Sequence, residues 1–286
     1  MNFAKLHGAG NDFILFDGRE GITREQLTPL LPIICHRRLG VGADGVLLLL
    51  PTGEQRARVV YWNSDGSPAS FCGNGTRCAA RFVFERWGWR EMVLETGFAA
   101  VPAVVEGNSV TLQLPAPAEV WPEKVYLVHG AAIRARYVML GVPHLVVRVG
   151  WPDFWRHPLE PLAPLLRRHP QLPAGGANVN FAREAGDGSV EARFFERGVE
   201  GETLASGSGV VAVALVATAE GWASPPVRVA TASGRELVVE VEGTPPMCPV
   251  RLHGPAEWVA EGTIADELLA SPLDAVEGRS FIEQSR

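Results

Sequence analysis

The chain lacks the features that would place it in a membrane or on a nucleic acid. Its 286 residues carry a net charge of −6 with no run of basic residues, which argues against a nucleic-acid surface. The longest apolar helical run, Val210 to Ala219, is too short to span a bilayer, and the first residues lack the apolar core of a secretory signal. We therefore expect a cytoplasmic protein that binds neither membranes nor nucleic acids.

Cysteine is scarce as well. The four cysteines cannot form a disulfide framework in a chain of this length, and no cysteine or histidine pair has zinc-site spacing. The glycines at 40–45 do not form a nucleotide loop, because they precede a strand and no Gly-Lys-Ser/Thr follows. The sequence thus predicts no metal and no cofactor. Cys35, Cys78 and Cys248 are most simply core residues.

Apolar residues are abundant, and they follow a repeated pattern. Hydrophobic residues make up 47% of the chain, which is enough for one large or two medium domains. Cys72-Gly-Asn-Gly corresponds to Ser206-Gly-Ser-Gly, and residues 10–13 correspond to residues 141–144. Each Gly-rich segment opens a strongly apolar helix, expected over 72–87 and 206–219, among many predicted strands.

This pattern predicts an α/β (α+β) fold with two pseudo-symmetric halves. Each half is expected to be a mostly antiparallel sheet wrapped around its central apolar helix. Further helical segments are expected over 23–38, with Thr23 as the cap, and over 158–168. The predicted boundaries are an N-terminal half over 1–117, a C-terminal half over 118–262 and a tail over 263–286.

Cys72 is the most informative residue of the first half. It stands immediately before Gly73-Asn74-Gly75, where a turn is expected to open the helix. Helix starts expose unpaired N–H groups and the positive end of the dipole, so they hold anions and lower the pKa of a thiol. We therefore expect Cys72 to have a pKa below the ~8.5 of a free cysteine. The alternative is a buried, inert cysteine beside an ordinary glycine turn.

Ser206 occupies the equivalent position in the second half. Two facing halves would place their helix starts on opposite sides of one cleft, with Cys72 on one side and Ser206 on the other. An amino acid between them could lose its α-proton to one residue and regain a proton from the other. The helix starts would stabilise the charge that develops on its carboxylate. The duplicated motif thus predicts stereoinversion without a cofactor, and the alternative is a binding cleft that performs no chemistry.

A set of motifs, in a fixed order, is similar to the motifs of a known family. The chain resembles diaminopimelate epimerase, of the cofactor-independent amino-acid racemase group that includes proline racemase-like enzymes, over roughly residues 1–262. The motifs are His7-Gly-Ala-Gly-Asn-Asp-Phe, Gly40-Val-Gly-Ala-Asp-Gly, Asn63-Ser-Asp-Gly-Ser, Cys72-Gly-Asn-Gly-Thr-Arg-Cys, Gly141-Val-Pro-His144, Asn178-Val-Asn and Glu196-Arg-Gly-Val-Glu-Gly-Glu-Thr-Leu-Ala-Ser-Gly-Ser-Gly.

The resemblance implies an active site between the halves and a small-molecule amino-acid substrate. It implies that Cys72 is one of two acid/base residues and that Ser206 stands in the place of the other, while His144 and Glu196 match residues that tune them. The family often pairs its subunits, so a homodimer is an expectation, although Ala260 stands where an aromatic residue is common. The implied substrate-binding residues are Gly73, Asn74, Gly207 and Ser208 at the reacting carboxylate, and Asn11, Asn63, Asn178 and Arg197 at the far end.

The same residues also fit ordinary structural roles. The asparagines suit turns, because Asn bonds its own backbone and tolerates a left-handed conformation. His144 could be a hydrogen-bonded strand-end residue, and Glu196 with Arg197 could be a surface ion pair. Their joint occurrence in the family order favours function.

Two positions depart from the family pattern. The family has a second cysteine where this chain has Ser206, whose hydroxyl is a weaker acid and needs an adjacent base such as His144 or Glu196. Val142 stands where the family has an asparagine that helps to hold the far end of diaminopimelate, and a polar group left unpaired there costs about 1–3 kcal/mol. The preferred prediction is epimerisation of LL- to meso-diaminopimelate, with Cys72 as the competent base. The alternatives are a racemase for another amino acid, a lyase or dehydratase with Cys72 as its sole base, and a non-catalytic amino-acid-binding protein.

Overall fold

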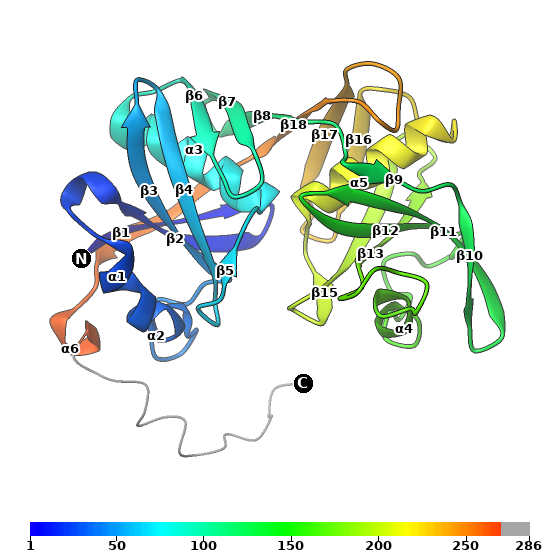
Figure 1. Ribbon diagram of the computed structural model, residues 1–286, viewed down its shortest axis with the longest axis horizontal. Coiled ribbons are helices and arrows are strands. Elements are labelled where there is room, and N and C mark those ends of the chain that lie inside the picture. Colours follow the sequence, from blue (N-terminus) through cyan, green and yellow to red (C-terminus); the bar gives the residue numbers. More distant parts are fainter. Residues whose placement is uncertain (270–286) are drawn as a thin grey trace, which may run out of the picture.

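The computed structural model describes residues 1–269 and shows two lobes side by side (Figure 1). A curved sheet in each lobe wraps around one helix, which is α3 (Gly73–Trp87) in the first lobe and α5 (Gly207–Ala219) in the second. Residues 207–217 of α5 are all buried, as expected for a helix that is apolar on every side. The predicted α/β fold of two similar halves is confirmed.

The strands of the two lobes follow one another in the chain. The first lobe contains β1 (Asn2–Gly8), β2 (Asn11–Asp17), β3 (Gly45–Gly53), β4 (Arg56–Asn63), β5 (Pro68–Ala69), β6 (Glu91–Glu95), β7 (Ala100–Glu106) and β8 (Ser109–Leu114). The next strands are β9 (Glu119–Val120), β10 (Lys124–Val128), β11 (Ala131–Leu140), β12 (Val142–Arg148), β13 (Asn178–Glu184), β14 (Val190–Glu196), β15 (Gly201–Thr203), β16 (Val227–Thr231), β17 (Glu236–Val241), β18 (Val250–Pro255) and β19 (Glu257–Thr263).

The strand pairing of the first lobe is repeated in the second. β1 and β2 are antiparallel, β2 runs parallel to β3, β3 is antiparallel to β4, and β4 runs parallel to β6. β11, β12, β13, β14 and β16 repeat these pairings in the same order. The central helix lies in the crossover between the last two parallel strands of each set, where a right-handed connection packs it against the sheet. The internal duplication therefore extends to topology.

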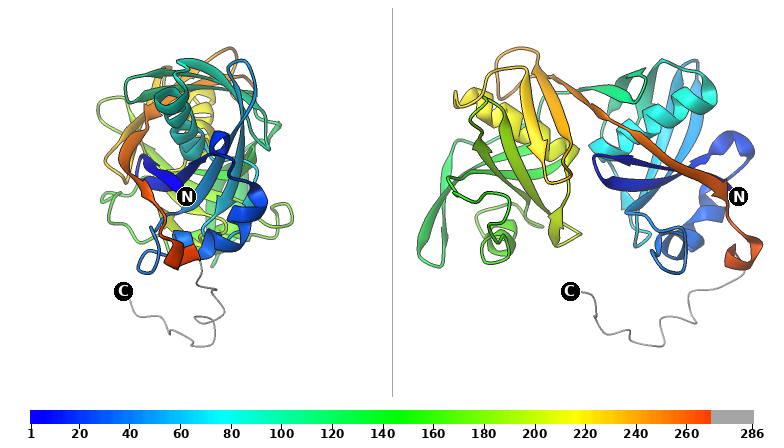
Figure 2. Two further views of the ribbon diagram at one scale, coloured as in Figure 1. Left: turned by 90° about the vertical axis from the view of Figure 1, so that its left-hand side faces the viewer. Right: turned by 180° about the vertical axis from the view of Figure 1, so that it is seen from behind.

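The lobes are joined by an exchange of strands. β8 pairs antiparallel with β18, its counterpart in the repeat, with Leu112 opposite Leu252. After β8 the chain enters the second lobe, where β9 pairs with β11, and after β18 it returns to the first lobe, where β19 pairs with β1 (Figure 2). The boundary expected at 117/118 falls between β8 and β9, and β18 and β19, which follow it in sequence, pair with strands of the first lobe. Each lobe thus receives its last strand from the other repeat.

Short helices cover the outer faces of the sheets. The helix expected over 23–38 is instead three short pieces, α1 (Arg24–Leu27), η2 (Thr28–Leu30) and α2 (Leu31–Cys35), because Pro29 and Pro32 interrupt it. The predicted cap is confirmed, since Thr23 forms a capping box with Gln26. Of the segment expected over 158–168, only α4 (Ala163–Arg167) is an α-helix. The remaining pieces are η1 (Gly18–Glu20) and α6 (Asp266–Leu269).

The apolar interior forms three clusters that follow this layering. One cluster surrounds α3 and α5 together, and it continues across the junction between the lobes. A second lies between the outer face of β12–β13 and α4, and a third between β2–β3 and α1–α2. Ile264 is buried in the third cluster, while residues 270–286 of the expected tail lie outside the described part of the chain. The two central helices therefore share one apolar cluster at the contact between the lobes.

Residues 1–269 contain neither a membrane-spanning helix nor a metal-binding group of side chains. Within this range no helix has both the length and the apolar character that crossing a membrane requires. Over the same residues, no group of three or more His, Cys, Asp or Glu side chains is arranged to hold a metal ion.

Candidate active site

The start of α3 is capped by Cys72. Its backbone is extended, and its Sγ accepts a hydrogen bond from the Gly75 N–H at 3.4 Å. Sulfur takes the place that a Ser or Asp oxygen usually fills at a helix N-cap. The thiol is therefore held at the positive end of the α3 dipole.

Ser206 caps α5 in the same way. Its Oγ accepts a hydrogen bond from the Gly209 N–H, also at 3.4 Å, so the two caps are structural equivalents. The two helix starts also touch, because a Cβ added to Gly73 would lie 3.1 Å from the Gly207 Cα. Since consecutive Cα atoms are ~3.8 Å apart, this contact brings the Cα atoms of Cys72 and Ser206 within about 12 Å of each other. Only glycine permits this approach of the two backbones.

Asn74 ties the two helix starts together. Its Nδ2 donates to the Ala205 carbonyl at 3.0 Å, just before the α5 cap, and to Asn11 Oδ1 at 3.3 Å. Its Oδ1 accepts from Arg77 Nη2 at 2.8 Å. The Asn74 side chain is thus fully engaged within the protein. A substrate carboxylate would have to use its backbone N–H.

Arg77 is a buried cation directly beneath this junction. It is fully buried in α3 and also donates to the Gly73 carbonyl. Burial lowers the pKa of Arg77 to about 10, so the guanidinium is charged at neutral pH. Two helix dipoles and one guanidinium therefore place positive charge around the Cys72 thiol and the glycines that follow it.

The expected acidity of Cys72 is wrong for the ligand-free protein. Burial, aided by the negative charge of Glu196, raises the pKa of Cys72 to about 11, although the Gly75 and Asn74 amides and Arg77 act to lower it. A short helix start cannot offset the lost hydration of a thiolate enclosed between two lobes. At neutral pH the resting side chain is therefore a thiol.

We expect the alkylation of Cys72 by iodoacetamide to reflect this raised pKa. Because only the thiolate reacts, the rate constant should rise about tenfold per pH unit up to an inflection near pH 11. Peptide mass spectrometry would follow Cys72 alone. Glu196→Gln removes a nearby negative charge, so it should accelerate the reaction at pH 8. An inflection at or below pH 8.5 would refute the burial argument.

Glu196 connects the two caps electrostatically. Burial raises the pKa of the Glu196 carboxyl, while the hydroxyls of Ser206 and Thr203 act to lower it. Glu196 in turn raises the pKa of Cys72. Of the two candidate bases for Ser206, Glu196 is thus the group that interacts with its hydroxyl.

His144 is more deeply buried than Glu196, and its hydrogen-bond partner is Asn180. It is fully buried on β12, and its Nδ1 accepts from Asn180 Nδ2 at 3.3 Å. Asn180 reaches the first turn of α5, since its Oδ1 would lie 2.9 Å from a Cβ at Gly209. Burial lowers the pKa of His144 to about 4, so the ring is neutral at pH 7. The ring is placed to support the α5 start through Asn180.

The pKa of His144 makes stability depend on pH. Between pH 6.5 and 4 the His144 ring becomes protonated in the unfolded chain but stays neutral in the folded protein. The free energy of unfolding should therefore fall as the pH is lowered. The loss from this group is about 3 kcal/mol at pH 4. Urea titrations at pH 7, 5.5 and 4 would measure it. His144→Gln should flatten this slope and exposed His129→Gln should not; equal slopes in all three proteins would contradict the assignment.

Of the four residues expected at the far end of the substrate, Asn178 and Arg197 lie together in the second lobe, whereas Asn63 ends β4 in the first lobe. The expectation for Asn11 is not met, because its Oδ1 lies 3.6 Å from Cys72 Sγ. Asn178 Oδ1 accepts from the Arg197 backbone N–H at 2.8 Å, and Asn63 Nδ2 donates to Ser67 Oγ at 2.9 Å. Arg197 is exposed, and within residues 1–269 its guanidinium has no hydrogen bond or ion pair. Its fork is thus available for a carboxylate. The expected surface ion pair between Glu196 and Arg197 is not formed.

Sequence reasoning did not single out three residues that surround Cys72. Arg77 and Asp44 belong to two of the motifs recognised in the sequence, so their place in those motifs could have identified them. Tyr61 gave no such signal. Its ring packs edge-on against Phe13, and burial together with nearby Cys72 and Glu196 raises the pKa of its hydroxyl.

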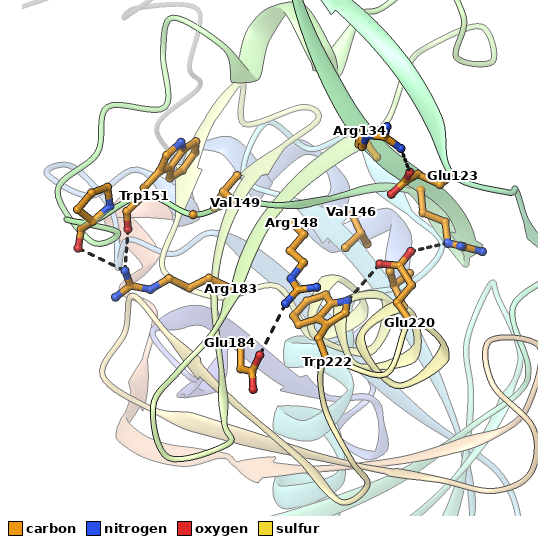
Figure 3. Close-up of a pocket in the computed structure, with 15 residues that line it drawn as sticks. Glu123, Arg134, Val146, Arg148, Val149, Trp151, Arg183, Glu184, Glu220 and Trp222 are labelled. Carbon is orange, nitrogen blue, oxygen red and sulfur yellow. Dashed lines mark hydrogen bonds and ion pairs between the residues drawn. The ribbon is translucent and has the colours of Figure 1, made fainter.

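A cavity of about 640 Å³ opens at the other end of α5 (Figure 3). The arginines that line it are already paired: Arg134 with Glu123, Arg136 with Glu220, Arg148 with Glu184 and Arg183 with Glu191. Glu220 also accepts from the Trp222 indole N–H. None of the residues expected in the active site lines it. The cationic groups of this cavity are neutralised by protein carboxylates, so it offers no unpaired cation to an anionic ligand.

The chain is similar in sequence to one family of known proteins over most of its length. A family model described as diaminopimelate epimerase matches residues 3–97 and 136–259. A diaminopimelate epimerase of Archaeoglobus fulgidus is 38% identical over 258 residues, covering 85% of this chain and 90% of that protein. A diaminopimelate epimerase of Aquifex aeolicus is 35% identical over 285 residues, covering 94% and 99%.

Solved structures share the fold at lower sequence identity. A hydroxyproline epimerase from Agrobacterium vitis, with bound trans-4-hydroxy-L-proline, superposes with a TM-score of 0.71 at 20% identity and covers 96% of this chain and 94% of its own. A phenazine biosynthesis protein of Bacillus anthracis has a TM-score of 0.71 at 16% identity and covers 92% and 98%. These likenesses concern the two-lobed architecture.

Proposed function

Because the chain belongs to the diaminopimelate epimerase family, whose members are isomerases that need no cofactor, we propose that it interconverts LL- and meso-diaminopimelate. This reaction would place it in lysine biosynthesis. One observation carries the proposal: two equivalent helix starts, capped by Cys72 and Ser206, meet through Gly73 and Gly207.

The reacting carboxylate would lie at the paired helix starts. The backbone N–H groups behind Cys72 and Ser206 and the buried Arg77 provide positive potential for it. When the α-proton leaves, negative charge spreads onto the carboxylate, and the same groups stabilise that charge most strongly at that point. Substrate binding brings a second change. An ammonium group beside Cys72 favours the thiolate electrostatically, which offsets part of the effect of burial.

The two faces are chemically unequal. Cys72 would remove the proton from one face as a thiolate. Ser206 would give its hydroxyl proton to the other face, and its interaction with the Glu196 carboxylate orients that hydroxyl. The Ser206 oxygen would then regain a proton from solvent, and the Cys72 thiol would return its proton to solvent before the next turnover. A hydroxyl is a weak acid, so the transfer from Ser206 is expected to limit the rate.

A second candidate is a racemase for another amino acid, which Val142 favours. This residue begins β12, two positions before His144, and its side chain offers no hydrogen bond to a distal amino-acid group. Arg197 still supplies a free guanidinium for a distal carboxylate.

Incubation of single L-amino acids in deuterated water would separate the candidates. With LL-diaminopimelate we expect deuterium at the α-carbon and a change of configuration. Mass spectrometry would detect the deuterium, and chiral chromatography would detect the change of configuration. Inversion of a different amino acid would favour the second candidate. Keto-acid formation would indicate a lyase, and no exchange with any amino acid would refute catalysis.

A further inference from the structure

Asn11 lies beside the Cys72 thiol, and hydrogen bonds to Asp44 and Asn74 determine the orientation of its amide. Its Nδ2 donates to Asp44 Oδ2 at 2.7 Å. A carboxylate accepts hydrogen bonds only, so the atom facing it must be the amide NH2 and not the amide oxygen. The hydrogen-bond network therefore fixes the Asn11 amide in one of its two orientations.

The opposite end of the Asn11 amide faces the site. Its Oδ1 accepts from Asn74 Nδ2 at 3.3 Å and lies 3.6 Å from Cys72 Sγ, which donates to it. If the amide turned over, its NH2 group would face the Asn74 NH2 group, and two donors would oppose each other. Asp44 and Asn74 together thus keep an acceptor, and not a donor, facing the site at this point.

Asp44 is itself held on both sides. Its Oδ1 accepts from Arg37 Nη2 at 2.6 Å, and Arg37 also binds Asp12 with two hydrogen bonds. The backbones of Asp12 and Asp44 are cross-linked as well: Asp12 N donates to Asp44 Oδ2 and Asp44 N donates to Asp12 Oδ1. The Asp44 carboxylate is therefore locked before any ligand arrives.

We propose that Asp44 is a positioning residue that keeps the Asn11 oxygen turned toward Cys72, so that this side of the site accepts a hydrogen bond from an ammonium group of the substrate. The identity of the substrate in this proposal rests on the proposed function. The orientation of Asn11 does not, because it follows from the hydrogen bonds of the Asn11 amide alone. An oxygen at this point selects a donor and disfavours a carboxylate there, which agrees with the carboxylate lying at the helix starts.

Three variants separate orientation from general damage. Asp44→Ala removes the acceptor for the Asn11 NH2 group, so that only the Asn74 hydrogen bond still orients the amide. Asp44→Asn can keep an oxygen facing Asn11 while it loses the ion pair to Arg37. Arg37→Gln loses the same ion pair and leaves Asp44 intact, so it is the matched control for the network.

The first readout is the epimerisation of diaminopimelate. Asp44→Ala is expected to raise KM by about tenfold or more, since a bond to a charged group is involved. Asp44→Asn and Arg37→Gln should each stay within about threefold of the parent. The double variant Asn11→Ala/Asp44→Ala should match Asn11→Ala alone, because Asp44 acts through Asn11. An additive double variant, or an Asp44→Asn variant as impaired as Asp44→Ala, would overturn the proposal.

The second readout needs no substrate. Alkylation of Cys72 by iodoacetamide at pH 8 should accelerate at least about threefold in Asp44→Ala, because an acceptor that stabilises the thiol is lost. Asp44→Asn should react as the parent does, and the effect of Asp44→Ala should vanish in the Asn11→Ala background. Unchanged alkylation in a folded Asp44→Ala protein would overturn the proposal. If diaminopimelate is not turned over by the parent, only the first readout is lost and the proposed function fails by itself.

Discussion

Replacement of Cys72 by Ala is expected to lower the rate of diaminopimelate epimerisation by ~10³-fold or more, because positioned acid/base groups contribute 10²–10⁴-fold. The loss should fall on kcat, since the backbone N–H groups that hold the carboxylate remain in place. Exchange of the α-proton with deuterated water should fall by the same factor, because no other thiol caps a helix at this junction within residues 1–269.

Cys35→Ala is the matched control for this experiment. Cys35 is also a free cysteine, but it is the last residue of α2, is buried in the third apolar cluster and caps neither central helix. Its truncation costs packing energy and should leave kcat within about twofold once the protein is folded. Retention of α-proton exchange in Cys72→Ala would remove the catalytic assignment.

Replacement of Ser206 by Cys is expected to raise kcat for epimerisation by ~10²-fold, because a thiol is a far stronger acid than a hydroxyl. The larger sulfur would occupy the same cap, where Gly209 N–H already donates to the side chain at 3.4 Å. It would mirror Cys72, which accepts from Gly75 at the same distance.

Ser206→Ala tests the same residue in the opposite direction. It removes the hydroxyl proton but keeps the backbone N–H groups of Gly207 and Ser208. We expect epimerisation to be lost while exchange with retention by Cys72 persists. If Ser206→Cys gives no gain and Ser206→Ala no loss, Ser206 does not face the substrate.

Local signals in the sequence were sufficient for the fold and for the positions of the caps. Each Gly-rich run precedes an apolar stretch, and an extended residue with a small polar side chain at that point becomes an N-cap, as Cys72 and Ser206 do. The shared offset between the two runs predicted the duplication. The repeated strand pairings confirm it.

The features that the sequence could not predict depend on contacts between residues far apart in the chain. The acidity of Cys72 was misjudged because the dipole effect is local, whereas the burial that outweighs it and the charge of Glu196 depend on the folded chain. The pairing of β8 with β18 and the return of β19 to β1 join residues more than a hundred positions apart, for which no periodicity gives a signal. The bond between Asn74 and the Ala205 carbonyl is of the same kind.

The most direct test of the account is to locate solvent deuterium during the first turnovers of LL-diaminopimelate. If Cys72 removes a proton from one face and Ser206 returns one to the other, deuterium should appear at the α-carbon of the inverted product. Ser206→Ala should abolish this product, while recovered substrate still gains deuterium through Cys72. Formation of deuterated inverted product at the parent rate in Ser206→Ala would show that Ser206 does not return the proton. That result would contradict the joint action of the two helix starts.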